Sequence, residues 1–175
     1  MHLADLLVAV AILGMVLAAI LGLLTMGQQA YAVGAGCVEA QQSARAALQR
    51  MAREIRTAGR GEGAFAAIAV AEPTLIVLQM DVNGDGAIAG RGETITWRLA
   101  GSVLRRDAGG GAQPVINGVS ALRFTYLDAS GQETSVADDV RSIAIALTAR
   151  PDHSSPGRWA DVATTVATQV RLRNR

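Results

Sequence analysis

The sequence predicts an α+β protein, in which one long N-terminal helix precedes a C-terminal, mostly antiparallel β-sheet domain. Three observations predict this fold class. Residues 6–26 carry no charge and are rich in Leu, Ala, Val and Ile. Small apolar residues between positions 37 and 58 recur at steps of three and four, which is the period of a helix. From residue 65 onward, short β-prone runs alternate with Gly, Pro, Asn and Asp.

The first segment, residues 1–27, is predicted to be an apolar helix half that protrudes from the domain. At about 1.5 Å per residue, residues 6–26 are long enough to cross the apolar core of a bilayer. Asp5 stands beside the N-terminal end of this run, where a carboxylate is unfavourable unless it reaches the interface or pairs with a cation. The nearest candidate cation is an α-amino group, either of its own chain or of a neighbouring chain.

The second segment, residues 28–58, is predicted to continue the helix as an amphipathic half that packs on the domain. Its apolar face is dominated by small residues, which allow a sheet to approach closely. Gly59 supplies a stop signal, so the helix is expected from residue 2 to about residue 58. The apolar face consists of Cys37, Ala40, Ala44, Ala47, Met51, Ile55 and Ala58.

The third segment, residues 59–175, is predicted to be the β-rich domain. Leu122, Phe124 and Tyr126 alternate with polar residues, as in a strand with one buried face. Turns are predicted at residues 99–102 and at Ser130-Gly131. The predicted strands cover residues 65–70, 74–80, 94–99, 103–106, 122–127, 143–149 and 162–172.

Composition and spacing argue against an enzyme. The formal net charge is +1, so global electrostatics do not indicate a nucleic-acid partner. The two histidines, His2 and His153, lie near the start of the helix and in a Ser/Pro-rich loop, so no base is placed beside a nucleophile and an orienting acid. The lone Cys37 is predicted to pack on the helix face, and Trp97 and Trp159 to pack in the core or at its rim, with a ligand platform as the alternative.

A basic cluster lies near the end of the predicted helix. We interpret it as a solvated helix face with Glu39 and Glu54 nearby, and DNA binding is the alternative interpretation. The cluster consists of Arg45, Arg50, Arg53, Arg56 and Arg60.

The N-terminal segment MHLADLLVAVAILG resembles the mature N-terminus of type IV pilins and type II secretion pseudopilins. The usual pattern there is an aromatic residue followed by Thr-Leu-Ile-Glu-Leu-Leu-Val-Ala. Met1, His2 and Asp5 stand in place of the aromatic residue, the threonine and the glutamate. The matching positions are Leu3, Leu6, Leu7, Val8 and Ala9.

This resemblance implies that a prepilin peptidase removes a leader before Met1 and methylates the new amine. It also implies that Asp5 helps to dock subunits, together with Leu6 in the apolar run. Many pilins have a proline near position 22, where the helix melts in the filament. Gly22 occupies that position here, and Gly14 is a second residue that weakens the helix.

The downstream segment ARAALQRMAREIRTAG resembles the helix end of PilW-like minor pilins and J-type pseudopilins. The order DVNGDG, GETITWRL, VLRR, ALRFTYLD, VRSIAIALTAR and VRLRNR is similar to the same branch. The resemblance implies a structural subunit of an extracellular pilus-like filament, held in the bacterial inner membrane before assembly. Its implied partners are its own copies, other pilins and the pilus or secretion assembly platform.

Two alternative functions remain open. The first is a minor pilin or pseudopilin that forms the tip or initiates the filament of a pilus or type II secretion system. The second is a monomeric membrane-anchored β-domain that binds a ligand or partner. A cleaved secretory signal ending at Ala30-Tyr31-Ala32 is disfavoured, because the stretch lacks a basic start and its apolar run is too long.

The segment Asp81-Val82-Asn83-Gly84-Asp85-Gly86 is the one metal-like motif. Oxygen side chains at alternate positions suit a hard cation such as Ca²⁺. An EF-hand does not fit, because the twelfth loop position is Gly92. A different calcium loop would use Asp81, Asn83, Asp85 and Glu93. The alternative is a tight turn between two strands, made of ordinary turn residues.

Overall fold

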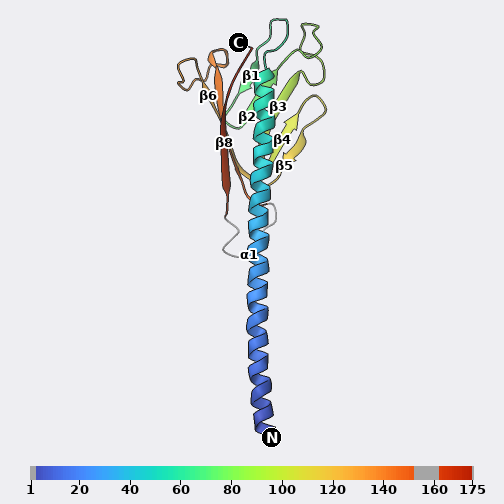
Figure 1. The fold of residues 1–175 in the computed structure, drawn as a ribbon. Coiled ribbons are helices and arrows are strands. Elements are labelled where there is room, and N and C mark those ends of the chain that lie inside the picture. Colours follow the sequence, from blue (N-terminus) through green and yellow to red (C-terminus); the bar gives the residue numbers. More distant parts are fainter. Residues whose placement is uncertain (1–2, 152–161, 175) are drawn as a thin grey trace. The chain divides into compact units, whose positions relative to one another are not determined.

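The computed structural model describes residues 3–151 and 162–174 and confirms the α+β class. One long helix, α1 (Leu3–Thr57), is followed by antiparallel strands (Figure 1). The chain divides into two compact units, Met1–Gly36 and Cys37–Arg175, and each unit is described by itself.

The first unit is helical from residue 3 to residue 36, and its apolar side chains are exposed. The most apolar 18-residue window has a mean hydropathy of 2.9, and 0% of it is buried. The helix runs without interruption through Gly14 and Gly22, and a Cβ added at either glycine would meet no atom within 4 Å. Among the described residues, one helix is therefore long and apolar enough to cross a membrane.

In the second unit, the predicted apolar face of α1 is buried. Ala44 and Met51 have no exposed surface, whereas Cys37, at the edge of the face, is only half-buried. Leu48 and Ala52 are also buried, although the period of the pattern did not place them on this face. These two residues lie beside strand β8 (Thr164–Arg171), so a second sheet widens the buried stripe of the helix.

The helix ends as predicted, with a glycine in the left-handed region. Gly59 has a φ of +75°, and a side chain there would collide with the backbone of Asn174. The side-chain amide of Asn174 donates to the carbonyl oxygens of Thr57 and Ala58, at 3.3 and 3.1 Å. Carbonyls at the end of the helix, of which that of Thr57 also accepts from the Arg60 N–H, are thus capped from a distant part of the chain.

The first sheet has five antiparallel strands in sequential order. They are β1 (Ile68–Ala71), β2 (Leu75–Gln79), β3 (Thr94–Ala100), β4 (Val103–Asp107) and β5 (Gln113–Ile116). Strand β5 was not predicted, because it is short and contains Pro114. A proline lacks the N–H that an interior strand must donate, and β5 tolerates it because it forms the edge of the sheet.

The second sheet has three antiparallel strands, β6 (Val119–Leu127), β7 (Ser142–Ala149) and β8, with β7 in the centre. The short helix η1 (Ala137–Asp139) lies between β6 and β7. The predicted alternation of β6 is confirmed, since Leu122, Phe124 and Tyr126 are buried. The sequence pattern indicated one sheet, but the chain starts a second one after β5, where Gly118 has a φ of +70°.

Both predicted turns are confirmed. Gly101 has a φ of +62° in the tight connection between β3 and β4, and Gly131 has a φ of +82° in the turn after β6. Glycine adopts a positive φ angle at no steric cost, which explains why a glycine stands in both turns.

Glu54 ties α1 to the first sheet. One carboxylate oxygen accepts a hydrogen bond from the indole N–H of Trp97 on β3, at 2.6 Å. The other oxygen pairs with the Nε of Arg106 on β4, at 2.9 Å, and lies 3.5 Å from the Nε of Arg50. Trp97 has no exposed surface and so packs in the core, one of the two predicted positions, whereas Trp159 lies outside the described residues. Since a buried N–H without an acceptor is costly, this carboxylate fixes the helix in register with β3 and β4.

We predict that Glu54→Ala destabilises the full-length chain by about 3 kcal/mol, because it leaves the Trp97 N–H and the Arg106 guanidinium without their acceptor. Urea unfolding in detergent micelles measures this loss. Glu39→Ala removes an exposed glutamate of the same helix and should change stability by less than about 0.5 kcal/mol. Equal effects of the two substitutions would contradict the assigned role of Glu54.

Candidate functional site

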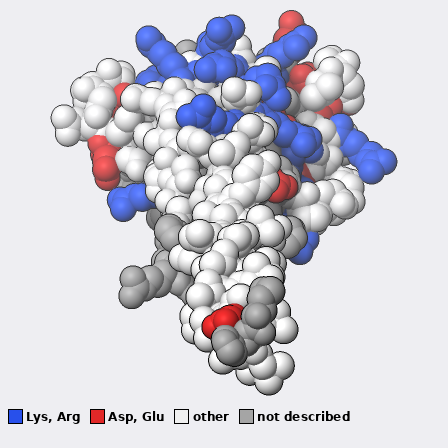
Figure 2. Space-filling model, turned by 60° about the horizontal axis from the view of Figure 1, so that its bottom comes forward, with Lys and Arg blue, Asp and Glu red and all other residues white. Residues whose placement is uncertain are grey.

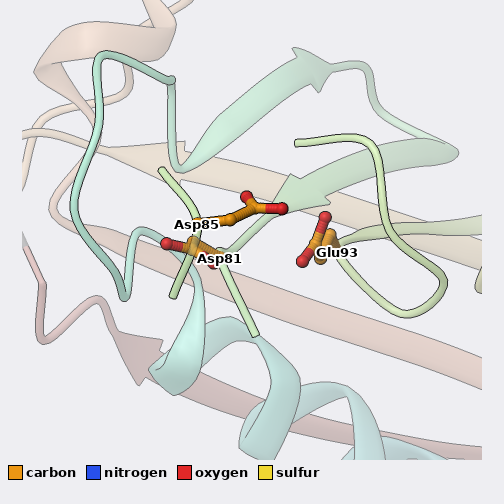
Figure 3. A group of neighbouring side chains, drawn as sticks. All are labelled: Asp81, Asp85 and Glu93. Carbon is orange, nitrogen blue, oxygen red and sulfur yellow. The ribbon is translucent and has the colours of Figure 1, made fainter. Parts of the chain in front are cut away.

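Three carboxylates gather at one end of the first sheet. Asp81 follows β2, Glu93 directly precedes β3, and Asp85 lies in the connection between these strands. One carboxylate oxygen from each residue lies within 4.8 Å of the others (Figure 3). The hairpin therefore brings together three of the four residues that the sequence pattern proposed as ligands.

The loop is ordered by its own side chains. The Asp81 carboxylate accepts hydrogen bonds from the backbone N–H of Gly84, at 2.6 Å, and of Gly86, at 3.1 Å. Both glycines have positive φ angles, of 80° and 75°, which turn their N–H groups toward Asp81. The fourth proposed ligand, Asn83, bonds to Asp85 through both ends of its amide, at 2.8 and 2.9 Å. Asn83 therefore organises the turn in this structure.

Two of the three carboxylates are buried. Asp81 is 4% exposed and Glu93 is 1% exposed. Glu93 accepts hydrogen bonds from the backbone N–H groups of Ala89 and Gly90. A Cβ at Gly61 would overlap Asp81, and a Cβ at Gly90 would lie 2.8 Å from the Glu93 carboxylate. Sequence reasoning missed these two glycines, because the need for a missing side chain depends on a neighbour that only the folded loop brings close.

The Asp81 carboxylate has a lowered pKa. Desolvation on burial raises this pKa, but hydrogen bonds from the backbone N–H groups of Gly84 and Gly86, with smaller contributions from Asp85 and Glu62, outweigh it. The pKa of Asp81 consequently lies below its ordinary value. This carboxylate is charged at neutral pH.

The three carboxylates have the chemistry of a divalent cation site. Within the described residues, no ion pair joins Asp81, Asp85 or Glu93 to an arginine. Two oxygens on opposite sides of a Ca²⁺ ion, each at about 2.4 Å, lie about 4.8 Å apart, so oxygens at the observed spacing can reach one ion. Backbone N–H groups that already hold Asp81 and Glu93 would also serve a plain turn. The residues thus fit both interpretations.

The remaining predicted site residues lie on the first unit. Asp5 stands in the first turn of α1, and Leu6 is 56% exposed. Met1, proposed as the methylated residue, lies outside the described residues, as do His2 and His153. The predicted solvated arginine face is present, because Arg45, Arg53, Arg56 and Arg60 are exposed and Arg50 pairs with Glu54.

Comparison with known protein families and with characterised proteins finds no match to this chain. Only the chain's own features therefore indicate its class. A single long N-terminal helix followed by antiparallel sheets is compatible with a pilin-like fold.

We predict that the Asp81 carboxylate makes stability depend on pH in the acid range. Its pKa is lower in the folded chain than the value of about 3.9 in an unfolded chain, so it stabilises the fold above about pH 4. This stabilisation is lost as the pH falls through the folded-state pKa. Asp81→Asn should therefore lose less melting temperature between pH 5 and pH 3 than the wild-type chain loses. Identical pH profiles would contradict the assignment.

Proposed function

We propose that this chain is a structural subunit of a filament, and that its class is the type IV pilin-like proteins. One observation carries the proposal: a continuous helix in which residues 3–36 expose an apolar surface and which continues into a second, compact β-rich unit. The pilin-like N-terminal pattern around Asp5 supports the same class. Under this proposal the function lies in self-assembly, without catalysis.

Burial of the apolar helix would drive assembly. Leu7 is 63% exposed, Leu13 59% and Leu21 60%, and each buried Å² of such surface contributes about 25 cal/mol. Before assembly, the lipid of the bacterial inner membrane would cover these side chains. In the extracellular filament, the same side chains would pack against the helices of neighbouring copies and of other pilins.

Asp5 would set the axial register of the copies. It is the acidic residue of the first helical turn, and the apolar residues that follow leave no other charge until Glu39. In apolar surroundings a carboxylate is stable only beside a cation, so an N-terminal amine of an adjacent copy would select one alignment of the helices. Cleavage by a prepilin peptidase and methylation at Met1 belong to this proposal.

Within this class, a main shaft subunit and a minor tip or initiator subunit share the same features of the helix. A monomeric membrane anchor shares the apolar surface but has no use for a carboxylate in register with another chain. The Asp5 variants below therefore separate the filament proposal from the anchor.

We predict that Asp5→Ala leaves a folded, membrane-inserted subunit that no longer enters filaments, in a cell that carries the assembly machinery. Filament counts by electron microscopy should fall at least tenfold, because the charge that aligns the helices is missing. Asp5→Glu keeps the carboxylate and should keep assembly. Membrane fractionation checks insertion of all variants. Normal filament numbers with Asp5→Ala would overturn the register role.

We also propose that Asp81, Asp85 and Glu93 bind Ca²⁺, with the loop of Asn83 as their support. The spacing of the three carboxylates and the burial of two of them without a described arginine partner support this site. A bound cation would offset the mutual repulsion of three negative charges. It would also fix the connection between β2 and β3.

We predict that 1 mM Ca²⁺ raises the melting temperature of the full-length chain by about 5 °C or more, if it exceeds the dissociation constant a hundredfold. Asp85→Asn should abolish the shift. Asp128→Asn is the matched control, because Asp128 also accepts backbone N–H groups in a turn but lies outside the cluster. No shift in the wild-type chain, or an equal shift with Asp85→Asn, would leave only the turn.

A further inference from the structure

A groove of about 510 Å³ runs between α1 and the outer strand of the second sheet. Helix residues from Gln41 to Arg56 form one wall, and Thr165 to Thr168 of β8 form the other. Among the described residues, strand β8 has a strand neighbour on one side only, and its residues 164–170 carry no charge and no proline. Edge strands normally carry charged residues or prolines, which prevent pairing with other chains. Because β8 lacks both between residues 164 and 170, its edge is suited to a contact.

The groove is positively charged at its rim. Arg45, Arg53 and Arg56 line it, no acidic residue does, and none of the three forms an ion pair in the part of the chain that the structure describes. Figure 2 shows arginine side chains gathered on the second unit. A charge that is left unpaired on one copy can be paired by another molecule.

The floor of the groove is apolar. Leu48 and Ala52 are each only 5% exposed, and Val166 of β8 lies opposite them. An occupant should therefore carry negative charges together with an apolar side chain. A phosphate backbone has the charges but no side chain for this floor, which favours an acidic peptide segment over a polyanion.

The chain itself contains a segment of this chemistry. Residues 133–139, Glu-Thr-Ser-Val-Ala-Asp-Asp, include three acidic residues and no basic residue. Glu133 and Asp139 are exposed, and Val136 between them exposes 53% of its surface. Arg141 holds the segment in shape by donating to the carbonyl oxygens of Asp138 and Val140, at 2.8 and 3.1 Å.

The segment and the groove have different places in the second unit. Asp138 lines a pocket with Gly59 and Asn174, just beyond the C-terminal end of α1. The groove extends back along the helix from Arg56 to Gln41, which is about 22 Å at 1.5 Å per residue. Copies displaced along the helix direction would therefore bring the segment of one against the groove of the next.

We propose that the groove binds residues 133–139 of a second copy of this chain, with Val136 on the apolar floor and Glu133 and Asp139 beside the groove arginines. Such a contact joins two different surfaces, so repetition gives an open helical polymer, in contrast to a closed dimer. The inference rests on the proposed filament function and names a second contact, separate from the Asp5 contact of the first unit.

The test uses full-length chains that carry Cys37→Ser, co-expressed as pairs with different tags. One chain carries Thr168→Cys and the other Val136→Cys. Because a disulfide forms only when the two Cα atoms come within about 7 Å, oxidation should give a heterodimer that bears both tags. Val82→Cys replaces Val136→Cys in the control, since Val82 is 64% exposed in another loop and should give no heterodimer.

Charge reversal then separates a specific contact from chance collisions. Arg45→Glu with Arg53→Glu in the first chain should lower the heterodimer yield at least tenfold. Glu133→Arg with Asp139→Arg in the second chain should restore it. A yield that ignores both reversals, or that is equal with Val82→Cys, overturns the inference.

Two further outcomes identify what has failed. Normal filaments without the heterodimer overturn this inference but leave the proposed function standing. A heterodimer in membranes of cells that form no filaments keeps the contact but removes the proposed function. If Arg45→Glu with Arg53→Glu instead abolishes retention on heparin while no heterodimer forms, the groove binds a polyanion and the inference is wrong.

Discussion

The apolar surface of residues 3–36 is the constraint on which the rest of the molecule depends. Its most apolar window has no residue buried among the described residues, and an apolar surface of this extent is unfavourable in water. The buried residues of the core in the second unit begin at Ala40. Under the filament proposal, an exchange of lipid for protein neighbours around the first unit would leave that core unchanged.

The side chains of α1 differ in size between the two units. Large aliphatic residues dominate the first unit, where the proposed partners are lipid tails or other helices. Alanines dominate the face from Ala40 to Ala58, where two sheets approach the backbone. This close approach brings the Glu54 carboxylate within reach of β3 and β4. Because its hydrogen bonds require a strict geometry, Glu54 fixes the position of the alanine face on the first sheet.

Local patterns predicted much of the fold. The helix limits, the alanine face and the alternation of β6 depend on periodicity and on the φ freedom of glycine, which are properties of short windows. Strand β5 and the division into two sheets depend on which strand edges meet, and no short window records that. The partner of the Trp97 N–H was equally hidden, because it lies 43 residues away.

The acidic cluster shows the same division between local and distant information. A motif of alternating oxygen side chains predicted that Asp81 and Asp85 would lie together, and the hairpin places Glu93 with them. The amide of Asn83, also predicted as a ligand, is instead held by its neighbour two residues on. Gly61 and Gly90 contribute only the absence of a side chain, which no pattern of ligands could reveal.

The cap that Asn174 places on the end of α1 has a consequence for the order of events during synthesis. The helix leaves the ribosome first, yet the amide that caps the carbonyls of Thr57 and Ala58 comes 117 and 116 residues later. The sheet that widens the buried face of the helix, through β8, is also translated late. Until then only the first sheet can cover the alanine face. The part of the helix face at Leu48 and Ala52, which lies beside β8, therefore gains its cover only after the last strand has been made.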